Sequence, residues 1–149
     1  MAMARFESPG VRQAPRTAGR QLTVWMVAKR SRLADELVDE LSRIRALSVR
    51  AATPRDVLDR PPARRRGMGR ADVVLIDQSV GAGDSIATAI VVRKRFAGVP
   101  VILLGDHDRS RATAELVLRT GASTYVDTRF GVDGIARAIL VALTSARAV

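Results

Sequence analysis

The strongest constraint on this chain is a repeated alternation of short apolar runs with segments of helical period. Five runs have the length and apolar character of buried strands, and they cover residues 22–27, 47–51, 71–76, 99–104 and 123–126. A helix-favouring segment follows each run, although the second is only a short turn that Thr53 and Pro54 begin. Because buried strands that alternate with helices build a parallel sheet covered on both faces, we predict an α/β fold.

The first and last predicted helices carry the clearest apolar stripes. Ser31 is the expected cap of the first helix, and its apolar positions are Leu33, Leu37, Val38, Leu41 and Ile44. The apolar positions of the last helix are Val132, Ile135, Ala136, Ile139, Leu140 and Leu143. Two further helices are predicted over about 84–96 and 110–119, with Gly98 and Gly121 as their stops. We expect the stripes to face the sheet.

The net charge of +10 is concentrated in two segments. Residues 1–21 hold four arginines and one acid, and they contain Pro and Gly without an apolar period, which predicts a disordered basic arm. Residues 60–70 hold five arginines and no acid, which predicts an Arg-rich loop inside a domain over 22–146. Arg64, Arg65 and Arg66 in this loop are interpreted as a solvated loop, a localisation patch, or a contact for an acidic protein or nonspecific nucleic acid.

Composition excludes several classes of function. The chain has no Cys and one His, which rules out thiolate chemistry, a disulfide framework and a multi-His metal site. No apolar run approaches the roughly 20 residues of a membrane span, and no secretion signal is evident. His107 is expected to lie in a solvated loop, and no helix-turn-helix signal predicts sequence-specific DNA binding. We therefore expect a cytoplasmic protein that is not an enzyme and does not contact membranes.

Three segments together resemble a known family. Asp77 follows the third predicted strand and precedes a glycine loop and Asp84, residues 100–104 form the fourth strand, and residues 121–126 lead into the fifth. In this order and spacing, residues 22–145 resemble the receiver domain of bacterial response regulators. The resemblance implies a flavodoxin-like, doubly wound (βα)5 sandwich with a five-stranded parallel sheet of order 2-1-3-4-5.

The resemblance also implies site residues. Receiver domains bind magnesium through an acidic pair after the first strand and a phospho-accepting Asp after the third. They contact the phosphoryl group through a Thr or Ser after the fourth strand and a Lys after the fifth. Asp77 matches the acceptor, whereas the acidic pair falls on Ala28 and Lys29, the hydroxyl on Gly105 and the Lys on Thr128. Because magnesium needs carboxylate ligands and the phosphoryl group needs positive charge, we predict a degenerate pseudo-receiver with a vestigial Asp77 and no metal or cofactor.

Two side chains near this edge carry further hypotheses. The Lys29 ammonium is expected to take the place of the metal ion and to pair with Asp77. Tyr125 falls where receivers have an aromatic switch residue, and it is interpreted as fixed in one orientation or as part of a binding face. Trp25 lies inside the first strand and is expected in the core.

The predicted function is therefore an atypical receiver-like signalling or interaction domain that acts through a protein partner in two-component-type regulation. In receivers, the face built from the fourth helix, fifth strand and fifth helix commonly forms homodimers, and here it spans about 110–143. Two alternatives stay open. One is a competent phospho-acceptor response regulator that uses Asp77 to control transcription or localisation. The other is a small-molecule-binding flavodoxin-like domain with loops 78–83 and 105–108 around its pocket.

Overall fold

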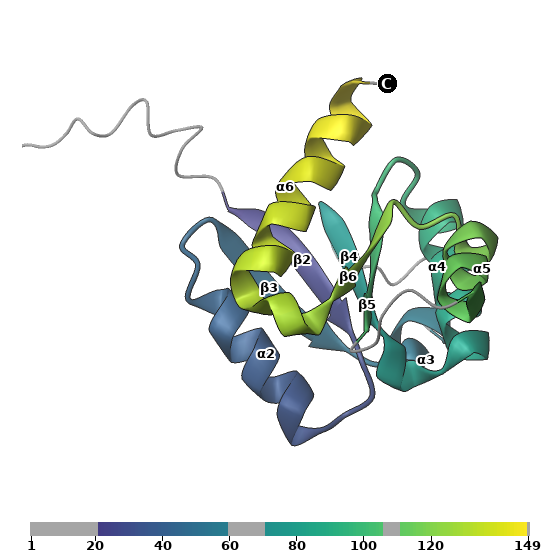
Figure 1. Cartoon of the computed structure of the whole chain (residues 1–149), viewed down its shortest axis with the longest axis horizontal. Helices are drawn as coiled ribbons and strands as arrows, with labels where there is room; N and C mark the ends of the chain where they lie inside the picture. Colours follow the sequence, from purple (N-terminus) through teal and green to yellow (C-terminus); the bar gives the residue numbers. More distant parts are fainter. Residues whose placement is uncertain (1–20, 60–70, 106–110, 149) are drawn as a thin grey trace, which may run out of the picture.

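A parallel sheet forms the centre of the computed structural model, which describes residues 21–59, 71–105 and 111–148 (Figure 1). Within these residues its five strands are β2 (Leu22–Val27), β3 (Leu47–Ala52), β4 (Val73–Asp77), β5 (Val101–Gly105) and β6 (Thr124–Asp127). Their spatial order is β3-β2-β4-β5-β6, and every neighbouring pair is parallel. The first strand along the chain thus lies between the second and the third, which confirms the predicted order 2-1-3-4-5.

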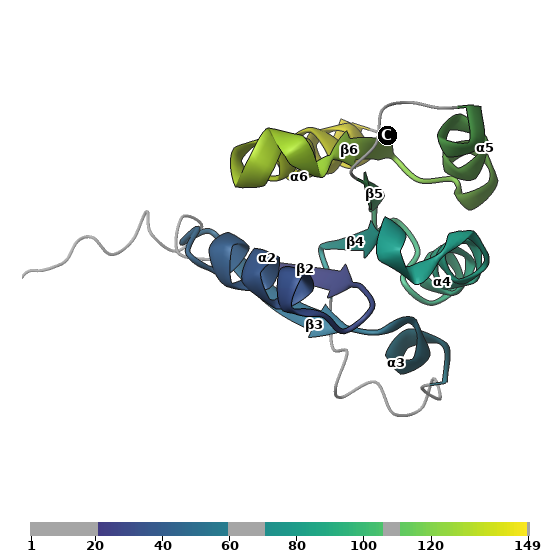
Figure 2. The ribbon, with the colours of Figure 1, turned by 60° about the horizontal axis from the view of Figure 1, so that its bottom comes forward.

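Helices cover both faces of the sheet. They are α2 (Arg32–Ser42), α3 (Pro54–Leu58), α4 (Ala82–Arg95), α5 (Arg111–Thr120) and α6 (Gly131–Ala148). Helices α2 and α6 lie on one face, and α3, α4 and α5 lie on the other (Figures 1 and 2). Two short 3-10 turns, η2 (Gln78–Val80) and η3 (Thr128–Phe130), directly follow β4 and β6. Among the described helices, none is both long and apolar enough to cross a membrane.

Local sequence signals account for the helix ends. The Ser31 side chain accepts a hydrogen bond from the Ala34 N–H at 3.1 Å, and Thr53 and Asp56 form a reciprocal capping box at the start of α3. Both caps were predicted and are confirmed. After α5, Gly121 adopts φ 70°, a left-handed conformation that glycine reaches without a Cβ clash.

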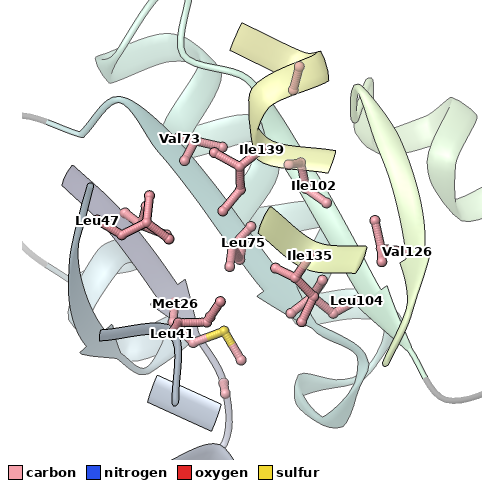
Figure 3. Close-up of a cluster of buried hydrophobic side chains, with 13 residues drawn as sticks. Met26, Leu41, Leu47, Val73, Leu75, Ile102, Leu104, Val126, Ile135 and Ile139 are labelled. Carbon is pink, nitrogen blue, oxygen red and sulfur yellow. The ribbon is translucent and has the colours of Figure 1, made fainter. Parts of the chain in front are cut away.

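The core is split into two layers by the sheet. Between the sheet and helices α2 and α6, side chains from every strand meet Leu41, Ile135 and Ile139 (Figure 3). On the opposite face, Trp25 packs with side chains of β4, β5 and α4, and only 6% of its surface is exposed. The prediction that Trp25 belongs to the core is confirmed. Because β4 is buried on both faces, its sequence is a continuous apolar run and not an alternation of apolar and polar residues.

Some predicted details are wrong. Strands β4 and β5 begin and end later than expected, at Val73–Asp77 and Val101–Gly105. Leu33 is 77% exposed because it lies in the first turn of α2, beyond the part of the helix that packs on the sheet. Leu140 is 60% exposed because Ile135, Ile139 and Ala142 define the buried side of α6. The predicted arm before Gln21, the loop 60–70 with Arg64, Arg65 and Arg66, and His107 lie outside the described residues.

Adjacent residues of α6 provide a direct test of this packing. Ile139→Ala should lower the free energy of unfolding by about 2–5 kcal/mol, because it opens a cavity in the layer under α6. Leu140→Ala should change it by no more than about 0.5 kcal/mol, since its side chain lies mostly in water. Urea denaturation of both variants gives the comparison. Equal losses would show that α6 packs in another rotation.

Candidate functional site

A cleft of about 530 Å³ opens at the carboxyl edge of the sheet. In a doubly wound sheet this edge is where ligands bind, close to the point at which the strand order reverses, here between β2 and β4. One wall is helix α2, and the other is made by the ends of β4 and β5 and by the turns η2 and η3. The residues that line the cleft are Met26, Ser31, Leu33, Ala34, Glu36, Leu37, Glu40, Asp77, Gln78, Ser79, Gly105 and Thr128.

Asp77 is the last residue of β4 and lines this cleft. Its Oδ2 atom accepts a hydrogen bond from the Ser79 N–H at 3.2 Å, so the carboxylate caps the turn η2. The Ser79 Oγ atom in turn accepts a hydrogen bond from the Lys29 N–H at 3.2 Å. Asp77 therefore caps the turn after β4, and Ser79 of that turn joins it to the loop after β2.

Ala28 and Lys29, the two positions at which the resemblance implies an acidic pair, lie in different surroundings. Ala28 is buried in the core, and its N–H donates to the Ala52 carbonyl at 2.9 Å. Lys29 is exposed and lines a second cleft of about 280 Å³, together with Arg30, Asp35 and others. Within the described part of the chain, no ion pair joins Lys29 to Asp77. The hypothesis of an internal Lys29–Asp77 salt bridge is therefore wrong, because the backbone of Lys29, not its ammonium, reaches the loop after β4.

Gly105 lies beneath two side chains that occupy the space where a larger residue would extend. A Cβ atom at position 105 would overlap the Tyr125 hydroxyl and Gln78 Oε1, and would lie 2.8 Å from Tyr125 Cζ. The Tyr125 ring is half-buried against the layer that contains Trp25, and its hydroxyl reaches the end of β5. Tyr125 thus lies inward, over a position that has room for it because residue 105 is glycine.

The turn η3, which follows β6, is held in place by the side chains of Asp127, Thr128 and Arg129. Thr128 Oγ1 donates to the Gly105 carbonyl at 3.1 Å, which ties the turn η3 to the end of β5. Asp127 is 8% exposed and accepts from Arg129 through Nε at 2.9 Å, through Nη2 at 2.8 Å and through the backbone N–H at 2.8 Å. Both guanidinium nitrogens meet Asp127 Oδ2, while the backbone N–H of Arg129 binds Oδ1. Asp127 therefore caps the turn that follows β6.

The residues at this edge do not fit a magnesium ion of the kind the resemblance implies. Magnesium takes hard oxygen ligands, usually from one or two carboxylates. Next to Asp77, positions 28 and 29 offer a buried methyl group and an amine. Across the described residues, no group of three or more His, Asp or Glu side chains could hold a metal ion. Nor does residue 105 supply a hydroxyl or residue 128 an ammonium for a phosphoryl group.

Three features of the site were not found by sequence reasoning. Gln78 was treated only as part of a loop, although its side chain covers Gly105. Glu36 and Glu40 were not predicted as site residues, yet both line the cleft. The spacing of Leu33, Glu36, Leu37 and Glu40 at three and four residues was a usable signal, because such residues share one side of a helix.

Comparisons with known proteins agree with this architecture. No protein-family model matches the chain, and no curated protein matches it. Among solved structures, a response regulator CheY-like protein from Mesorhizobium loti is similar with a TM-score of 0.61 and 18% identity, over 83% of this chain and 99% of that one. The receiver domain of the Francisella response regulator 1452 is similar with a TM-score of 0.65 and 18% identity, over 84% and 98%.

A third structure is the signal receiver domain of an HD domain-containing protein from Pseudomonas fluorescens Pf-5, with a TM-score of 0.66 and 14% identity over 87% of this chain and 100% of that one. These similarities span nearly the whole of each compared domain. They show that the chain has the CheY-like receiver fold.

The contact between Gly105 and Tyr125 can be tested by a double-mutant cycle. Gly105→Ala should lower the free energy of unfolding by about 1–3 kcal/mol, because its methyl group overlaps the Tyr125 hydroxyl. In a Tyr125→Leu background the same substitution should cost less, since the hydroxyl and ring are gone. Gly83→Ala is the control, because a Cβ there meets nothing within 4 Å, and it should not destabilise the chain. Urea denaturation measures all four variants, and equal costs in both backgrounds would contradict the packing described.

Proposed function

We propose that this chain is an atypical receiver domain, a signalling or interaction module that works without magnesium-dependent phosphorylation of Asp77. The proposal rests on the receiver fold together with the carboxyl edge of the sheet. It assigns the protein to two-component-type regulation in the cytoplasm, with a protein partner as its output and no chemical reaction of its own.

The observation that carries the proposal is the inward position of Tyr125 over Gly105. The space that a threonine or serine side chain would take in a receiver is filled by the Tyr125 hydroxyl and the Gln78 side chain. Thr128 lines the cleft, but its hydroxyl donates to the Gly105 carbonyl, which occupies the donor that an anion would need. In this proposal, the packing around Gly105 stabilises a single conformation of the domain, and that conformation forms without a phosphoryl group.

Phosphorylation assays test the proposal directly. With acetyl phosphate or beryllofluoride and magnesium, the chain should form no adduct at Asp77, because positions 28 and 29 supply no carboxylate for magnesium and position 128 supplies no cation for the phosphoryl oxygens. Intact-mass spectrometry reads the phosphoryl adduct, and fluorine NMR reads beryllofluoride. A conventional receiver treated in parallel is the positive control. An adduct at Asp77 would favour the alternative of a competent phospho-acceptor.

A gain-of-function variant sharpens this test. Ala28→Asp combined with Lys29→Asp places two carboxylates after β2, beside the end of β4. The variant should bind magnesium more tightly than the original chain in a calorimetric titration. Circular dichroism shows whether it is folded, which matters because Ala28 is buried.

The proposed interaction surface is the face formed by α5, β6 and α6. Strand β6 is at the end of the described sheet and pairs on one side only, with β5. An open edge of this kind leaves backbone groups that a partner can cover. The flanking elements carry large exposed apolar side chains, with Leu118 on α5 at 80% exposure and Leu140 and Val141 on α6. These features favour a protein contact here, and we propose a second copy of the chain as the partner.

Dimerisation through this face predicts a concentration-dependent mass. Analytical ultracentrifugation of the full chain should show a monomer–dimer equilibrium. Leu118→Asp should shift it toward monomer, because the variant would place a charge in the interface. Ile90→Asp on α4 is the matched control, since Ile90 is also exposed but lies outside the proposed face. A monomer at all concentrations, or equal effects of both variants, would exclude this interface.

A further inference from the structure

A further cleft, of about 520 Å³, opens at the amino edge of the sheet, and we call it the amino-edge cleft. Val101, the first residue of β5, lines it, whereas Gly105 at the other end of this strand lines the cleft beside α2. In Figure 1 the amino edge lies toward the top, where α6 ends. The described residues that line the cleft are Arg93, Ala97, Gly98, Val99, Pro100, Val101, Gly121, Ser123, Ala142 and Ser145. This set includes a cation, Arg93, and no Asp or Glu.

The Arg93 guanidinium is held in place by the end of α5. Its Nη1 atom donates to the Thr120 carbonyl at 3.4 Å, and a Cβ atom at position 121 would overlap Nη1 and lie 2.8 Å from Cζ. Glycine at position 121 therefore lets the guanidinium lie directly against the backbone. A guanidinium has five N–H donors, and in the described part of the chain the Thr120 carbonyl is the one acceptor that Arg93 contacts. One donor thus positions the group, and the others are available to a ligand.

Stabilisation of a helix end is the simplest role for Arg93. A cation beside the last carbonyls of a helix interacts favourably with the helix dipole, and this accounts for the hydrogen bond to Thr120. It does not account for the further donors in the same cleft. Ser123 and Ser145 line the cleft, and within the described residues neither hydroxyl has a hydrogen-bond partner. Three side chains with available donors therefore line one cleft that lacks a carboxylate.

The helix ends around this cleft are positively charged. The last turn of α4 contains Arg93, Lys94 and Arg95, the last turn of α5 contains Arg119, and neither turn contains an acid. Arg95 Nη1 donates to the Val57 carbonyl at 3.1 Å, so this side chain is turned toward α3 and not toward the cleft. Arg93 is then the member of the group that lines the cleft. Cations gathered in this way attract anions and raise their local concentration.

Apolar side chains form much of the remaining lining. Pro100, Val101 and Ala142 are buried, and Val99 is half-buried. An inorganic ion would leave this surface in water, whereas an organic anion with a short apolar group would cover it. The volume of about 520 Å³ lies within the range of about 300–1,000 Å³ that small-molecule sites occupy. The cleft therefore matches a ligand that carries an oxyanion and an apolar group side by side.

We propose that the amino-edge cleft binds a small organic phosphate or carboxylate. Arg93 donates to two oxygens of the oxyanion, Ser123 and Ser145 donate from their hydroxyls, and the apolar group packs against Val99 and Ala142. The planar fork of a guanidinium fits both kinds of oxyanion. The inference does not rest on the proposed function, because it uses neither the carboxyl edge of the sheet nor the exposed apolar residues of the proposed dimer face.

An NMR titration of the full, isotope-labelled chain tests this site. The probes are phenyl phosphate, benzoate and inorganic phosphate, each added at constant ionic strength. The backbone amide signals of Gly98, Gly121 and Ser123 should shift, whereas those of Asp77 and Gly105 at the opposite edge should not. Phenyl phosphate should bind about threefold or more tightly than inorganic phosphate, because its ring covers apolar surface. Comparison of phenyl phosphate with benzoate shows which oxyanion the site prefers.

Two matched substitutions separate the cleft from charge in general. Arg93→Gln should weaken the binding of phenyl phosphate about tenfold or more, because it removes the charged donors. Lys94→Gln removes the same charge from the next residue, which is not among those lining the cleft, and should weaken binding by no more than about twofold. Circular dichroism verifies that both variants are folded. The proposal is overturned if no probe shifts the three signals selectively, if the two variants act equally, or if inorganic phosphate binds as tightly as phenyl phosphate.

Discussion

Burial of both faces of the central strands is the constraint on which the rest of this structure depends. Strands β2, β4 and β5 have neighbours on both sides and helices above and below, so their side chains are almost entirely removed from water. Two-sided burial requires crossover helices on both faces, and crossovers of one hand reverse the strand order between β2 and β4. The carboxyl ends of four strands then meet beside α2, which is why a cleft forms at this edge of the sheet.

The carboxyl edge retains the frame of a receiver site but has different chemistry. Asp77 caps a turn, Thr128 binds the carbonyl of Gly105, and Arg129 holds Asp127. Each polar group is used for a contact inside the protein. A methyl group, an amine and a glycine stand where a phosphorylated receiver needs carboxylates and a hydroxyl. In the proposed function, interactions within the chain take the place of interactions with a metal ion and a phosphoryl group.

Charge is distributed unevenly along the whole chain and not only at the carboxyl edge of the sheet. The arginine-rich segments 1–20 and 60–70 contrast with the acidic exposed side of α2. Net charge alone suggested a polyanionic partner, whereas Glu36 and Glu40 place two carboxylates along the cleft at the carboxyl edge of the sheet.

The sequence by itself determined the alternation of strands and helices, the caps at Ser31 and Thr53, the burial of Trp25 and the position of Asp77 at a strand end, because these follow from local periodicity and hydrogen-bonding capacity. The order of its motifs predicted the receiver fold. The residue types at positions 28, 29, 105 and 128 predicted that the magnesium and phosphoryl contacts of a receiver are missing. Only the tertiary structure decided that Lys29 lines a different cleft from Asp77, that Leu33 and Leu140 are exposed, and that Tyr125 lies over Gly105. The direction of a side chain at a strand end depends on residues more than twenty positions away, and no local pattern carries that information.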